Sequence, residues 1–195
     1  MRINSKKNNT LNFKSILAAI LAVMILSTYS AQAQSMQDII NGLTNPKMLD
    51  LNIDNIEKTS TPWGTFKRGK KDEDGALKFT AIKNNQLASM MFFQDAKKWL
   101  LVDLTVLLFE GDKACAANYK KLAAVAQKKL GKPNAIEKNN QQESGAFWQL
   151  KDHKEWGIWV ATVTGLNPKN NQEECAVKAT LAFGADEYLS EDSGF

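Results

Sequence analysis

The chain has 195 residues, of which 44% are hydrophobic and 24% charged, a balance that excludes the disordered, collagen-like and multi-span membrane classes. It carries 25 basic and 21 acidic residues, but four of the basic ones are the only charges before residue 34, so the rest of the chain is neutral with 21 of each sign. Neutrality argues against nucleic acid or an anionic membrane as a partner, although the whole-chain charge of +4 suggests one.

The first segment has the pattern of an export signal. A basic, polar start leads into an apolar run over residues 16–26, which as a helix would span roughly 16 Å, about half of a ~30 Å hydrocarbon core. Ala31 and Ala33 then form the small-x-small pattern that a signal peptidase recognises. The sequence predicts a signal peptide over 1–33, cleaved between Ala33 and Gln34, and a periplasmic or secreted protein without a stable membrane span. An uncleaved N-terminal anchor is the alternative.

The N-terminal part of the mature chain predicts one helix followed by short strands. Apolar residues at helical spacing predict a short helix that begins at Ser35 and ends before Pro46. Alternation over 49–53 predicts a strand, and 63–66 a second one, followed by a charged turn over 67–75. Residues 77–93 then predict a hairpin that turns at two asparagines.

The strongest pattern lies in the middle of the chain. Residues 99–109 are apolar at nearly every position, which predicts a central strand buried on both faces. Gly111 stops that strand, and an amphipathic helix follows over 113–130 with Cys115 on its apolar side and lysines on the other. Three further strands are predicted over 146–151, 156–164 and 175–183.

Together these elements predict one α+β domain over 34–184. Its sheet is expected to be largely antiparallel, with about six or seven strands, the long helix 113–130 on one face and a short N-terminal helix. The 162 residues that remain after cleavage are enough for one hydrophobic core. The last residues, 185–195, form an acidic tail that we expect to fray.

The only cysteines of the chain are Cys115 and Cys175. In an exported protein such a pair predicts a disulfide. The alternative is a reactive thiol at Cys115, because a helix N-terminus lowers a thiol pKa. A low-pKa thiol would itself oxidise in that compartment, which favours the disulfide.

Several common site types are not supported by the sequence. Residues 64–70 match the start of a P-loop, but Lys71 replaces the hydroxyl residue that holds magnesium. The acidic turn 72–75 lacks carboxylates at the first and last ligand positions of a calcium loop. A single histidine, His153, excludes a His-pair metal motif and is expected in an exposed turn. We therefore predict no cofactor and no metal.

Two sets of residues are candidates for a site. Asp103 interrupts the apolar strand 99–109, and burial would raise its pKa as a general acid requires. Alternatively, it hydrogen-bonds to a neighbouring strand or lies on an uncovered part of the sheet. Of the five tryptophans, Trp63, Trp156 and Trp159 are the candidates for surface anchors of a ligand or protein, and core packing is the alternative.

The pattern as a whole favours a small exported binding protein without catalysis, acting on another envelope or secreted protein, for example as an immunity protein or inhibitor of a toxin-like effector. A second hypothesis is an envelope hydrolase that uses Asp103 as acid or base. A third is a glycan-binding module that stacks sugars on its tryptophans. The patterns do not specify an oligomeric state.

Overall fold

The computed structural model describes residues 35–83, 85–96, 98–139 and 142–186. The chain divides into two compact units, Met1–Ser35 and Met36–Phe195, and the description below concerns the second. The predicted signal peptide and most of the predicted acidic tail lie outside the described residues. Within those residues, no helix is both long and apolar enough to cross a membrane.

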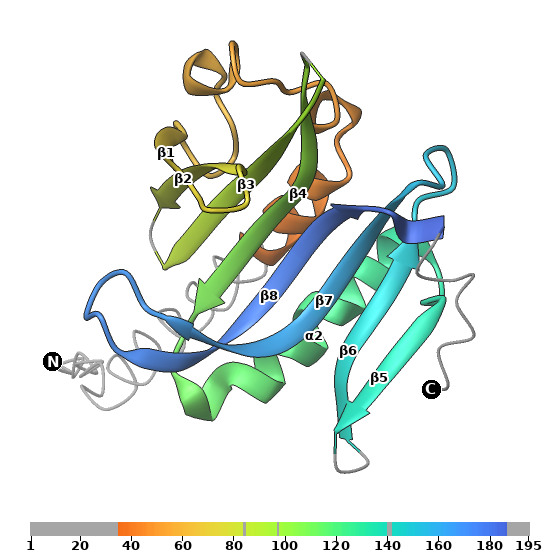
Figure 1. The fold of residues 1–195 in the computed structure, drawn as a ribbon. Coiled ribbons are helices and arrows are strands. Elements are labelled where there is room, and N and C mark those ends of the chain that lie inside the picture. Colours follow the sequence, from red (N-terminus) through yellow and green to blue (C-terminus); the bar gives the residue numbers. More distant parts are fainter. Residues whose placement is uncertain (1–34, 84, 97, 140–141, 187–195) are drawn as a thin grey trace, which may run out of the picture. The chain divides into compact units, whose positions relative to one another are not determined.

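The second unit contains one antiparallel sheet with the strand order β1-β2-β3-β4-β8-β7-β6-β5 (Figure 1). The strands are β1 (Lys67–Lys71), β2 (Leu77–Lys83), β3 (Gln86–Asp95), β4 (Lys98–Phe109), β5 (Ala135–Asn139), β6 (Gln142–Gln149), β7 (Trp156–Leu166) and β8 (Glu173–Phe183). The predicted α+β class and antiparallel sheet are confirmed, but the sheet has eight strands rather than six or seven.

The two strands that were not predicted from the sequence, β1 and β5, form the two edges of the sheet. Every residue of β1 is exposed, and β5 is short and mostly polar. Neither strand has an apolar face, so neither shows the alternation by which strands are recognised. The charges on β1 are typical of an edge strand, because they discourage pairing with another chain.

The two strands predicted before residue 67 are wrong. The segment holds two 3-10 turns instead, η1 (Pro46–Met48) and η2 (Ile56–Lys58). Between them the Asn52 side chain accepts hydrogen bonds from the backbone N–H groups of Asp54 and Asn55, at 3.0 and 3.2 Å. Such local bonds satisfy the backbone without a partner strand. Residues 63–66 form no strand, and the bridge between Thr61 and Gly64 closes a tight turn there.

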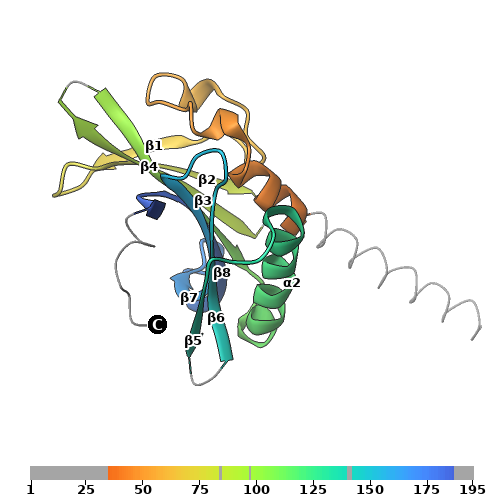
Figure 2. The same cartoon turned by 90° about the vertical axis from the view of Figure 1, so that its right-hand side faces the viewer.

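Both α-helical segments lie on the same face of the sheet (Figure 2). Residues 36–43 are helical, and α2 covers Asp112–Leu130, as predicted to within one residue. The first helix packs into the hydrophobic core, while α2 contacts β6, β7 and β8. The indole N–H of Trp148, on β6, donates a 3.0 Å hydrogen bond to the carbonyl of Gly131 at the end of α2.

The central strand β4 is fully buried on only one face. Val102 has no partner on β3, because the pairing register shifts there. As a result Leu101 and Leu104, three residues apart, both point into the core. On the other face Asp103 and Thr105 are half-buried. The prediction of a strand buried on both faces is therefore corrected, because both helices cover the same side of the sheet.

The predicted disulfide is confirmed. Cys115, in the first turn of α2, is bonded to Cys175 near the start of β8, with an S–S distance of 2.02 Å and a sequence separation of 60. The carboxylate of Asp112 accepts a 2.7 Å hydrogen bond from the backbone N–H of Cys175. Two contacts thus join the start of the helix to the same strand.

Candidate functional site

The face of the sheet opposite the two helices, called the open face below, carries two of the four candidate residues, Asp103 and Trp159. Its members follow from the pairing register, because residues that pair across strands share a face. Three rows cross it: Lys78–Met91–Asp103–Ala182–Gly157, Thr80–Ser89–Thr105–Thr180–Trp159–Phe147, and Ile82–Leu87–Leu107–Lys178–Ala161.

Asp103 lies near the centre of the open face. Burial raises the pKa of its carboxyl above the ordinary value of 3.8, and the nearby ammonium groups of Lys178 and Lys78 and a 3.5 Å hydrogen bond from the Thr105 hydroxyl oppose that rise without cancelling it. The charged groups that act on this carboxyl are both basic. Asp103 is therefore a partly buried carboxylate on the part of the sheet that the two helices do not cover, with its hydrogen bond on its own strand.

A pair of hydroxyl groups continues this polar centre. The side-chain oxygens of Thr105 and Thr180, on the adjacent strands β4 and β8, lie 2.8 Å apart. Thr180 is only 6% exposed, so the bond holds a buried polar group between neighbouring strands. Asp103, Thr105 and Thr180 therefore form one continuous chain of hydrogen bonds across β4 and β8.

We expect Asp103→Asn to become more stable relative to the wild type as the pH rises. The native carboxyl has a raised pKa, so the Asp103 contribution to stability is fully present below 3.8, its unfolded value, and is lost as the pH rises through the native pKa. The asparagine does not titrate and escapes this loss. Urea unfolding of both proteins between pH 3 and pH 8 measures the difference, and parallel curves over that range would contradict it.

The structure separates the three candidate tryptophans. Trp63 and Trp156 are core residues, 1% and 7% exposed, and neither ring is available for stacking on a ligand. Trp159 is half-buried on the open face, where its ring lies 5.9 Å from that of Phe147. Sequence reasoning could not separate Trp156 from Trp159, because rings on either face of a strand fit the same alternation, and Trp63 lies in a turn whose packing has no local signal.

The open face also carries exposed apolar side chains that the sequence analysis did not single out. Phe93 and Leu100 pair across β3 and β4 and are 39% and 49% exposed, and Ile82 on β2 is 60% exposed. Each of these residues falls on the side of its strand that ordinarily carries polar residues in a soluble protein. An apolar residue at such a position is the sequence signal that could have identified them.

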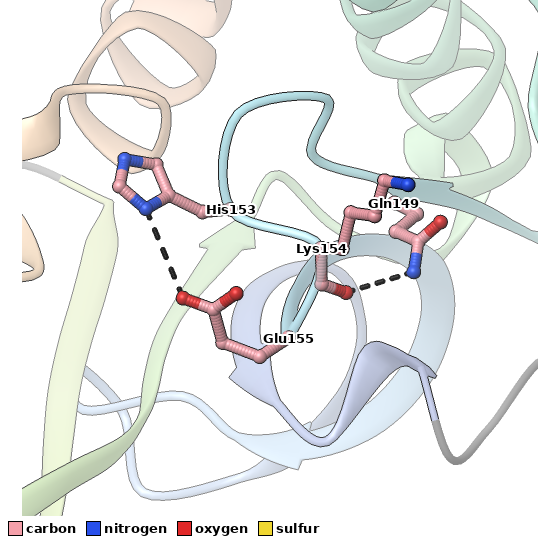
Figure 3. Close-up of polar contacts among 4 residues, drawn as sticks. All are labelled: Gln149, His153, Lys154 and Glu155. Carbon is pink, nitrogen blue, oxygen red and sulfur yellow. Dashed lines mark hydrogen bonds and ion pairs between the residues drawn. The ribbon is translucent and has the colours of Figure 1, made fainter.

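His153 lies in the β6–β7 turn, away from the open-face rows. Its Nδ1 atom is 3.8 Å from the Glu155 carboxylate, and both side chains are 44% exposed (Figure 3). The Gln149 amide donates to the carbonyl of Lys154 at 2.8 Å across the same turn. The histidine therefore occupies an exposed turn, as expected.

The described ranges contain no cluster of three His, Cys, Asp or Glu side chains placed to hold a metal ion. Comparison with known proteins finds no protein-family model that matches the chain, and no curated protein or solved structure with significant similarity to it. The functional argument therefore rests on the open face itself.

Proposed function

We propose that the protein is an exported, non-catalytic binding protein whose open face engages another envelope or secreted protein, such as a toxin-like effector. The observation that carries this proposal is the set of exposed apolar side chains on the open face: the adjacent pair Phe93 and Leu100 at one end of β3 and β4, and Ile82 near the other end of β3. Adjacent exposed apolar side chains on one face of a soluble domain are characteristic of protein-binding surfaces.

The polar groups between these apolar side chains suit a protein partner. Charged groups at an interface set the orientation of the partner. Lys78 and Lys178 flank Asp103 on the open face, so the side chains around Asp103 carry more positive than negative charge, and Glu137 lies at the far end of the Lys178 row. The expected partner surface is therefore acidic opposite the two lysines and apolar opposite Phe93 and Leu100.

Site-specific photocrosslinking tests the proposal. A photoreactive residue at Ile82 or Leu100 should form an adduct with one protein in cells that make the natural partner. The same residue at Ala117, which is exposed on α2, is the matched control and should form none. Adducts of equal yield at all three positions, or none at any, would count against the proposal.

Affinity for the purified partner gives a quantitative prediction. Leu100→Glu should weaken binding about 10- to 100-fold, because it places a charge in the apolar part of the interface. Lys78→Glu should slow association and make it less sensitive to salt. Ala117→Glu should leave binding unchanged. Isothermal titration and surface plasmon resonance measure these effects, and equal affinity of Leu100→Glu and the wild type would exclude the open face as the binding surface.

A hydrolase centred on Asp103 remains the second candidate, favoured by the raised pKa of that carboxyl. A glycosidase-type mechanism needs a second carboxylate, and among the described residues the charged groups that act on Asp103 are lysines. The two hypotheses separate in one experiment. Asp103→Asn should abolish hydrolysis of envelope polymers if the residue is catalytic, while the binding proposal expects partner affinity to change by less than about tenfold.

A further inference from the structure

A groove of about 390 Å³ lies between α2 and the strands β5 and β6, on the helix side of the sheet. This volume falls within the range of about 300–1,000 Å³ that is typical of small-molecule sites. The groove is separate from the open face, so its role is independent of the function proposed above. Its lining includes Lys120 and Ala124 from α2, Lys132 from the loop after it, Ile136 from β5 and Trp148 from β6.

The floor of the groove is apolar and held in place. The ring of Trp148 is 2% exposed, and its N–H is already bonded to the carbonyl of Gly131. It therefore closes the bottom of the groove, offers almost no surface for stacking and has no free donor. Ile136 is 42% exposed beside it. The small side chain of Ala124 on the facing helix leaves space above this floor.

The charge at the groove has one sign. Lys120 and Lys132 line it and are exposed, and no acidic side chain belongs to the lining. The nearest acid along β5, Glu137, points to the other side of the sheet: its carboxylate lies 2.8 Å from where a side chain on Gly145 would begin, beside the ring of Trp159. The two lysines at the groove therefore lack an acidic partner among its lining residues.

We propose that this groove binds a single-chain amphiphile with an anionic head group, such as a fatty acid or an alkyl phosphate. The chain would lie between Ile136 and Ala124, and the head group would be held by Lys120 and Lys132. A neutral chain would leave the two ammonium groups with water alone, and a bare anion would leave the apolar lining unused. The combination of one apolar floor with charge of one sign selects an amphiphile.

Titration of the purified full chain with four probes below their aggregation concentrations tests this assignment. Dodecanoic acid and dodecyl phosphate should bind, each about tenfold or more tightly than the neutral dodecyl maltoside, and inorganic phosphate should not bind. Calorimetry measures the affinities, and chemical-shift changes of the Trp148 indole N–H locate the ligand. Equal binding of the neutral and anionic probes would show adsorption to apolar surface and overturn the proposal.

Three variants place the binding in the groove. Ala124→Phe fills the space from an exposed helix position and should abolish binding without loss of the fold, which circular dichroism checks. Lys120→Glu combined with Lys132→Glu should weaken the anionic probes about 10- to 100-fold. Lys128→Glu, an exposed lysine of α2 outside the groove, is the control and should bind normally. Binding that survives Ala124→Phe unchanged would show that the probes bind elsewhere, for example at the apolar run 16–26, and would refute the site.

Discussion

Replacement of both Cys115 and Cys175 by alanine is expected to lower the free energy of unfolding by about 4 kcal/mol. The bond closes a loop of 60 residues, and in the chain-entropy model the loss of that constraint stabilises the unfolded chain by this amount. Net stabilities of single domains are about 5–15 kcal/mol, so the variant should be only marginally folded. Urea unfolding followed by circular dichroism measures the change.

Two controls make this result specific. The wild type unfolded in the presence of reductant should lose about the same stability as the double variant, because both lack the cross-link but only one lacks the thiols. The double variant itself should not respond to reductant. A loss below about 1 kcal/mol would mean that the unfolded chain stays compact around the two positions without the bond.

The second large effect is expected at Trp148. Trp148→Ala should lower the free energy of unfolding by about 3–5 kcal/mol, as is typical for removal of a buried aromatic ring. The ring is 2% exposed, and its N–H joins β6 to the carbonyl of Gly131 after α2. The variant therefore loses the packing between helix and sheet together with one hydrogen bond. Chemical unfolding followed by far-ultraviolet circular dichroism measures it without a tryptophan signal.

Trp159→Ala is the matched comparison for this effect. Trp159 is half-buried on the open face, which neither α2 nor the helix over 36–43 covers, so its removal should cost clearly less than that of Trp148. Trp148→Phe should fall between the two, because it keeps most of the ring but loses the donor. Equal losses for Trp148→Ala and Trp159→Ala would contradict the division into a covered and an open face.

The parts of the fold that were predictable are those with a local signal. Helix α2 has apolar residues at helical spacing and a glycine at each end, and its observed bounds are Asp112–Leu130. The β2–β3 hairpin has alternating residues on both sides of an asparagine turn. Strand β1, in contrast, has five exposed residues and no alternation. Its conformation comes from hydrogen bonds to β2, which a local pattern does not contain.

The candidate site was predictable only in part, for the same reason. Asp103 stood out because a carboxylate in an apolar strand is unusual. Its neighbours Lys78 and Lys178 come from strands far apart in the chain, and nothing near either lysine in the sequence points to Asp103. The lining of the groove likewise combines α2, the loop after it and two strands, whose proximity follows from packing alone.

By itself, the sequence determined the α+β class, the extent of α2, the disulfide pair and the neutral charge beyond residue 34. These properties follow from composition and from spacings of a few residues, because local sterics and solvent exposure act over such short distances along the chain. The tertiary structure decided that β8 pairs with β4 in the middle of the sheet, that both helices cover one face, and that Asp103, Thr105 and Thr180 meet on the other. Those contacts join residues up to 79 positions apart in chain order, and their formation depends on how whole elements bury their apolar faces together.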